Sequence, residues 1–181
     1  MRHLSCFKCS LFVVLFVWGV AMFLSGEASS LELSSTSFSN GGDIPVRYTG
    51  RGEDISPEMS WGDAPEGTKS FVLILDDPDA PMGSWVHWVV YNIPADVTVL
   101  EEDIPQVEVL DNGARQGTTS FGSVWYRGPA PPPGPAHRYI FTLYALDEML
   151  ELPSGAGKKE VLSAMKGHVL AQSEYMGLFS S

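Results

Sequence analysis

The chain has 181 residues, of which 22 are acidic and 11 are basic, so its formal net charge is −11 at pH 7. A protein of this charge repels the phosphate backbone of nucleic acids, and we therefore expect no nucleic-acid partner. The two cysteines, Cys6 and Cys9, both stand in the first ten residues. The remainder of the chain therefore has neither a disulfide framework nor a thiol nucleophile.

The beginning of the chain has the pattern of a targeting segment. Two basic residues flank its start, residues 11–24 form an uncharged run of fourteen, and the small residues of SGEASS follow. This order is typical of a secretory signal peptide, with cleavage expected after Ala28 or Ser30. A retained membrane anchor is less favoured, because a spanning helix needs roughly 20 apolar residues. We predict a signal peptide at 1–28, a single domain at 29–181 and a periplasmic or secreted location.

Short runs rich in aromatic and β-branched residues alternate with clusters of Gly, Pro, Asn and Asp through the rest of the chain. The runs 70–75, 85–93 and 138–147 are apolar on both faces, as is typical of central strands covered on both sides. Weaker strand patterns occur near residues 31, 44, 59 and 174. The pattern predicts a mainly β fold of two packed sheets.

One helix is expected near the C-terminal end. Val161 and Met165 stand four residues apart within Lys158–Gln172, on an apolar stripe that predicts a helix packed over a sheet edge or end. His168 falls within this helix, where a structural role is expected. Residues 105–136 are loop-like, and a long ordered loop in a compact domain is usually functional.

Two histidines stand at the starts of predicted central strands. Side chains alternate across a strand, so His87 shares a face with Trp85 and Val89, and His137 shares a face with Tyr139. If the two strands are neighbours, both imidazoles face one cavity, with the aspartates of DDPDAP on its rim. The alternatives are a hydrogen-bonded core histidine at each position and turn caps for the aspartates.

The DDPDAP turn has to bring Asp77 and Asp79 to the strand end, which predicts a cis peptide bond between Ala80 and Pro81. An enzyme is disfavoured: Ser84 is near these groups, but the chain has no G-x-S-x-G elbow, phosphate loop or H-x-x-x-H metal pair. Two His and two Asp can bind zinc, yet the same residues serve an anion without a metal.

Three stretches together carry a resemblance to a known family. They are DDPDAP followed by WVHWVVYNIPADV, then YRGPAPPPGPAHRYIFTLYALD, and finally HVLA in the predicted helix. The chain resembles the phosphatidylethanolamine-binding protein family, and within it the bacterial Raf-kinase-inhibitor-like branch of the YbhB/YbcL type. The similarity runs from about Leu33 to about Phe179. It implies a Greek-key β-sandwich of two antiparallel sheets with a C-terminal α-helix, and a small cavity for phosphate-like anions.

The resemblance also implies which residues form that cavity. The expected ligand-binding residues are Asp77, Pro78, Asp79, Trp85, His87, Gly128, Pro129, His137 and Tyr139. The two imidazoles, the Tyr139 hydroxyl and the backbone N–H groups of the Gly128 loop are expected to donate to a phosphate. Asp77 is expected to orient an imidazole, and Asp79 to accept an ammonium. No cofactor and no metal are expected.

The resemblance implies a binding protein for phosphate or phosphorylated head groups such as phosphoethanolamine, with a regulatory role toward kinases or proteases, and the signal-peptide pattern adds export. A periplasmic protease inhibitor that acts through surface loops is the alternative, a phosphate-ester hydrolase is less favoured, and a homodimer is left open. Two residues depart from the family pattern. Val86 stands where eukaryotic members often have the first of two histidines, and Ala130 stands where bacterial relatives often have Cys. Arg127 is a potential extra cation at the cavity mouth.

Overall fold

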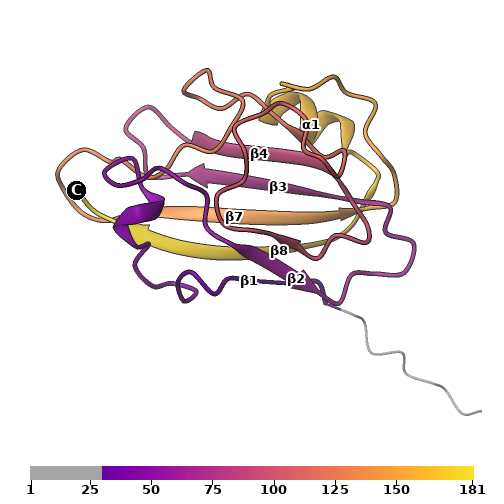
Figure 1. The fold of residues 1–181 in the computed structure, drawn as a ribbon, viewed down its shortest axis with the longest axis horizontal. Coiled ribbons are helices and arrows are strands. Elements are labelled where there is room, and N and C mark those ends of the chain that lie inside the picture. Colours follow the sequence, from indigo (N-terminus) through magenta and orange to yellow (C-terminus); the bar gives the residue numbers. More distant parts are fainter. Residues whose placement is uncertain (1–29) are drawn as a thin grey trace, which may run out of the picture.

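The computed structural model describes residues 30–181, which form two antiparallel sheets and one α-helix (Figure 1). The small sheet has the order β1 (Glu32–Ser34), β2 (Met59–Gly62), β5 (Val99–Leu100). The large sheet has the order β6 (Arg115–Gln116), β4 (Trp85–Pro94), β3 (Ser70–Asp77), β7 (His137–Leu146), β8 (Val169–Phe179). The predicted mainly β fold of two antiparallel sheets with a C-terminal helix is confirmed. The expected signal peptide, 1–28, lies outside the described residues.

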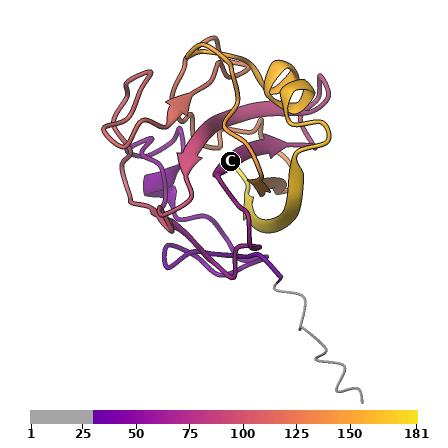
Figure 2. The same cartoon turned by 90° about the vertical axis from the view of Figure 1, so that its right-hand side faces the viewer.

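Apolar residues on both faces of the large sheet build two cores. Trp88 and Phe141 are fully buried between the two sheets, whereas Val89 packs with Val161 between the large sheet and α1 (Lys158–Ala164). Figure 2 shows α1 on one side of the large sheet and the N-terminal segments on the other. Since central strands are covered on both faces, their sequences lack the polar alternation of half-exposed strands. No helix within residues 30–181 is long and apolar enough to cross a membrane.

The helix ends earlier than its apolar periodicity predicts. α1 stops at Ala164, and Gly167 adopts a left-handed φ of +86° before the chain enters β8. Glycine tolerates this conformation because it has no Cβ, so it ends the helix at low cost. The predicted helix Lys158–Gln172 is therefore wrong beyond its second turn, and His168 lies outside it. The ladder between β7 and β8 takes up the remaining residues.

Two other expectations are corrected. The segment near residue 44 is not a strand but leads into a 3-10 helix, η1 (Val46–Tyr48). No peptide bond within residues 30–181 is cis, so the bond between Ala80 and Pro81 is trans. The reversal is made instead by Gly83, whose φ is +93° and whose N–H donates to the Ala80 carbonyl at 3.0 Å. Glycine supplies the unusual dihedral angle that the turn requires.

A β-bulge at the start of β4 changes which way its side chains face. Asp76 pairs with Val86 and Leu75 pairs with Trp88, so His87 is the extra residue. Two residues then oppose one, and the strand bends locally. His87 is thereby turned to the face that also carries Trp88, rather than to the α1 face where Val89 packs. The predicted sharing of one face by His87 and Val89 is wrong for this reason.

Candidate functional site

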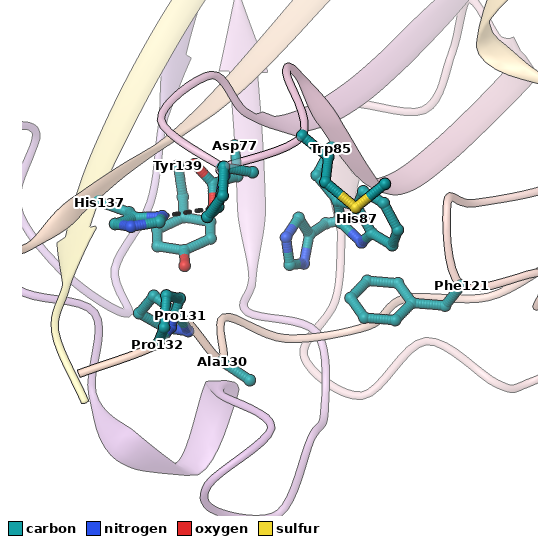
Figure 3. Close-up of a pocket in the computed structure, with 12 residues that line it drawn as sticks. Asp77, Trp85, His87, Phe121, Ala130, Pro131, Pro132, His137 and Tyr139 are labelled. Atoms are coloured by element: carbon teal, nitrogen blue, oxygen red, sulfur yellow. Dashed lines mark hydrogen bonds and ion pairs between the residues drawn. The ribbon is translucent and has the colours of Figure 1, made fainter. Parts of the chain in front are cut away.

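A cavity of about 310 Å³ lies where β3 ends and β4 and β7 begin, on the face of the large sheet that carries the inter-sheet core (Figure 3). Its walls are Asp77, Ala80, Pro81, Met82, Trp85, His87, Phe121, Ala130, Pro131, Pro132, His137 and Tyr139. Because neighbouring strands are antiparallel, the end of β3 meets the starts of both neighbours at one edge. The topology therefore brings together three segments that are far apart in the sequence.

Asp77 and His137 form a buried pair at one side of the cavity. The His137 Nδ1 lies 2.8 Å from the Asp77 Oδ2, and the two side chains are 12% and 5% exposed. A carboxylate only accepts hydrogen bonds when it is ionised, so Nδ1 carries the proton. The other Asp77 oxygen accepts the Asp79 backbone N–H at 2.9 Å. Asp77 thus fixes the imidazole ring and closes the turn that follows β3.

His87 is 3% exposed and lies across the cavity from His137 (Figure 3). Its Nδ1 lies 2.6 Å from the Arg127 carbonyl oxygen, and its ring packs edge-on against Tyr139 and Phe121, each at 5.2 Å between centroids. A carbonyl accepts only, so Nδ1 is the protonated nitrogen. Burial lowers the pKa of His87 below its ordinary value of 6.5. Neutral His87 therefore keeps Nε2 as a hydrogen-bond acceptor.

Tyr139 supplies a buried hydroxyl without a partner. The residue is fully buried, and its hydroxyl makes no hydrogen bond within the described part of the chain. Figure 3 shows the hydroxyl pointing toward Pro131 and Pro132. Burial and, second, the charge of Asp77 raise the pKa of Tyr139. The hydroxyl is therefore protonated at neutral pH, and its hydrogen is available to a ligand.

Asp79 does not line this cavity. Its carboxylate forms a bidentate pair with Arg138, whose Nη2 is 2.7 Å from Oδ1 and whose Nε is 2.9 Å from Oδ2. Hydrogen bonds from Arg138 lower the pKa of Asp79 to about 2. The carboxylate expected to accept an ammonium thus has a cation of its own outside the cavity. Pro78, beside it, is also absent from the cavity walls.

Gly128 and Pro129 hold the loop before β7 in place instead of lining the cavity. The Gly128 N–H donates to the Asp54 Oδ1 at 2.6 Å, and the Pro129 carbonyl accepts the Gly50 N–H at 2.9 Å. The Gly128 N–H was expected to donate to a phosphate, but it already donates to Asp54. Arg127 is paired as well, with its Nε 3.2 Å from the Asp54 Oδ2.

Comparison with known proteins identifies the family. The profile described as "Phosphatidylethanolamine-binding protein" matches residues 34–180. The chain belongs to this family. It is 51% identical over 157 residues to a protein of Aquifex aeolicus, covering 86% of this chain and 91% of that one. It is 41% identical over 158 residues to YbhB of Escherichia coli, covering 83% of this chain and 100% of YbhB.

Solved structures agree with the assignment. A crystal structure described as a putative phosphatidylethanolamine-binding protein homologue of Chlamydia trachomatis matches with a TM-score of 0.78 at 39% identity, covering 84% of this chain and 99% of that one. E. coli YbcL, described as a new member of the mammalian family, matches with a TM-score of 0.77 at 31% identity and the same coverages. The resemblance to the YbhB/YbcL branch is confirmed.

Five of the nine residues predicted for the family cavity line it: Asp77, Trp85, His87, His137 and Tyr139. The sequence reasoning missed the apolar walls, above all Phe121 and Met82. Phe121 packs edge-on against Trp85 at 5.6 Å, and Met82 is 87% exposed at the cavity edge. Both residues stand in loops, where no periodicity marks a side chain as facing a site.

A group with metal-ligand chemistry lies elsewhere. Asp147, Glu148 and His168 have ligand atoms within 4.8 Å of one another, at the opposite end of β7 from His137. The His168 Nδ1 is 2.9 Å from the Asp147 Oδ1 and 3.1 Å from the Glu148 Oε2. These partly exposed groups are already paired with one another. His168 is therefore a useful control position for histidine substitutions in the cavity.

Buried His87 should make the protein less stable in mild acid. Its pKa is lowered in the folded state, so below about pH 6.5 the unfolded state binds more protons and the free energy of unfolding falls. We expect a smaller fall between pH 7.5 and pH 5.5 in His87→Gln than in the parent. Urea denaturation at these two pH values measures the free energy of unfolding of both proteins. An equal fall in both proteins would show that His87 does not titrate differently on unfolding.

Proposed function

We propose that this family member binds a phosphate-type group of a small ligand in the cavity of Asp77, His87, His137 and Tyr139. The observation that carries the proposal is the Tyr139 hydroxyl, a buried donor that has no hydrogen-bond partner among residues 30–181 and lies beside the free edge of a fixed imidazole. A buried polar group left unpaired costs roughly 1–3 kcal/mol. A ligand oxygen that accepts from Tyr139 would recover this cost.

The two imidazoles suit different oxygens of a phosphate. Asp77 holds the Nδ1 side of the His137 ring, so a protonated His137 would donate from Nε2 to an anionic oxygen. Neutral His87 accepts at Nε2, because its Nδ1–H is held by the Arg127 carbonyl. A singly protonated phosphate offers both an anionic oxygen and a P–OH donor. The site thus fits a phosphate monoanion better than a dianion.

An ammonium group on the ligand should add little to the affinity for this cavity. Asp77 is the one carboxylate on the cavity wall, and it already accepts hydrogen bonds from His137 and Asp79. Phosphoethanolamine and inorganic phosphate should therefore bind with similar strength. We propose a binding site rather than a hydrolase, since the walls carry no Ser, Thr or Cys nucleophile.

Calorimetric titration with inorganic phosphate and phosphoethanolamine tests the proposal. We expect dissociation constants in the micromolar to millimolar range, because a small anion offers few atoms and the net charge of −11 opposes it. Affinity should rise as the pH falls from 8 to 6, since phosphate monoesters have a second pKa near 6. Proton uptake should make the heat at pH 7 depend on the ionisation enthalpy of the buffer. Affinity that falls with acidification would contradict a monoanion site.

A second candidate is regulation of a protease or kinase through the cavity mouth. It is favoured by Met82, whose side chain is 87% exposed beside the anion cavity, and by Phe121, which is 44% exposed. Exposed apolar side chains around a pocket are typical of protein contact sites. Met82→Ser should weaken inhibition of a responsive protease and leave phosphate titration unchanged. Inhibition that Met82→Ser leaves intact would argue against this surface.

We also propose export, on the sequence pattern of residues 1–28. Intact-mass measurement of the protein from a cell-envelope fraction should give a chain that begins near Ser29. A chain that begins at Met1 and needs detergent for extraction would favour a retained anchor.

A further inference from the structure

A second hollow, of about 620 Å³, lies between α1 and the loop after β6. Its walls are Val86, Thr118, Thr119, Ser120, Gly157, Lys158, Lys159, Leu162, Ser163 and Lys166. We call it the lysine groove. Val86 and Trp85 are consecutive in β4 and face opposite ways, so the groove and the first cavity lie on opposite faces of the strand. The two sites share no lining residue.

The lysine groove gathers positive charge on an acidic protein. It holds three of the nine basic residues that follow the predicted signal peptide, and no acidic residue lines it. Lys158 is paired with Asp76 at 2.5 Å at the base of α1. Lys159 and Lys166 are exposed and make no ion pair with residues 30–181. Two free ammonium groups therefore flank a hollow with no countercharge in its walls.

Hydroxyl groups in the same walls add free donors. The Ser120 Oγ accepts the Val86 N–H at 2.9 Å, which leaves its own hydrogen free. Ser163 makes no side-chain hydrogen bond to the described residues, whereas the Thr118 hydroxyl donates to the Gly155 carbonyl at 2.7 Å. Hydroxyl and ammonium donors around one hollow match a ligand rich in anionic acceptor oxygens.

We infer that the lysine groove is a second ligand site, which takes a small molecule with two or more linked phosphate groups. Lys159 stands in the first turn of α1 and Lys166 in the turn that follows Ala164, at opposite ends of a helix roughly 10 Å long, too far apart for one phosphate to meet both closely. The volume suits a small organic ligand, for which pockets of about 300–1,000 Å³ are usual. Val86 and Leu162 give an apolar surface beside the charges. This inference is independent of the function proposed for the first cavity.

Calorimetric titration with inorganic triphosphate at low salt tests the groove. We expect one site in the parent and a roughly 10-fold weaker affinity in Lys159→Gln and in Lys166→Gln, since each loses a charge-assisted contact. Lys69→Gln is the matched control, because Lys69 is exposed, makes no ion pair with residues 30–181 and does not line the groove. Its affinity should change less than about 2-fold. If all three variants bind triphosphate equally weakly, the loss is explained by the change in net charge alone, and the proposed site is wrong.

The His137→Gln variant separates the groove from the first cavity. Triphosphate binding should persist in it with unchanged affinity, whether or not the first cavity binds phosphate. Loss of triphosphate binding in His137→Gln would place the ligand in the first cavity and overturn the groove site. A parallel titration with adenosine triphosphate tests whether the groove also contacts an organic group attached to the phosphates. If adenosine triphosphate binds more tightly than inorganic triphosphate, and Leu162→Ser reduces this gain, the apolar wall contacts the base.

Discussion

Replacing His137 with glutamine is expected to weaken phosphate binding by roughly 10- to 100-fold. The side-chain amide of glutamine can still donate to Asp77 at short range, but it cannot present a second ring nitrogen to the anion as the His137 imidazole does. A hydrogen bond to a charged group is worth about 1.5–3 kcal/mol, which corresponds to this loss of affinity. The rise in affinity between pH 8 and pH 6 that comes from protonation of the phosphate itself should persist in the variant. Calorimetric titration with inorganic phosphate measures both effects.

His168→Gln is the control for this substitution. His168 is also an imidazole held by carboxylates, Asp147 and Glu148, but it lies at the other end of β7. Its replacement should leave phosphate affinity within about 2-fold of the parent, since it can act on the cavity only through screened long-range charge. If His137→Gln binds phosphate like the parent, the Asp77–His137 pair is a buried structural pair and the proposed site is wrong.

Substituting Gly128 with alanine is expected to lower the free energy of unfolding by about 1–3 kcal/mol, the usual cost of overpacking. An added Cβ would lie 2.5 Å from the Tyr48 carbonyl oxygen and 2.7 Å from the Thr49 Cα. Both are backbone atoms at the end of η1 and cannot rotate away. The loop must shift, and with it the Arg127 carbonyl that holds His87. Urea denaturation measures the loss of stability. Phosphate titration measures how the displacement of the Arg127 carbonyl changes the affinity for phosphate.

Gly62→Ala is the matched control. Gly62 is exposed at the end of β2, has no atom within 4 Å of an added Cβ, and does not have a left-handed φ. Alanine there should leave stability unchanged or raise it by about 0.5–1 kcal/mol, because it restricts the unfolded chain. If Gly128→Ala is as stable as Gly62→Ala, the close packing of the loop on η1 is not a constraint on the site.

The sequence predicts the central strands well, because their patterns reflect burial on both faces. It also predicts that His87 and His137 share one cavity: the alternation of Trp85, Val86 and His87 is confirmed, and it fails only beyond the bulge, where Val89 faces the other way. The assignment of Asp79 to the cavity is wrong because Arg138, at the start of β7, competes for its carboxylate. Such pairing depends on which strands are neighbours, and that information is not local in the sequence.

The end of the helix was missed for a different reason. Residues 158–172 keep an apolar stripe at helical spacing, but the same residue types are also compatible with an edge strand. From Val169 onward the chain forms β8, which pairs with β7 at ten positions. Gly167 is the local signal that the periodicity argument overlooked. The lysine groove was missed because two of its walls come from segments about forty residues apart.

The extra residue in β4 makes the cavity depend on residue count as much as on residue identity. If one residue were deleted between Trp85 and Trp88, the ladder with β3 would lose its bulge and the strand would return to simple alternation. A relative with the same histidine in a strand one residue shorter would present that imidazole to α1 instead of to Asp77 and Tyr139. A single-residue gap at this point in an alignment of the family would therefore distinguish chains that form this cavity from chains that have the same residue types without it.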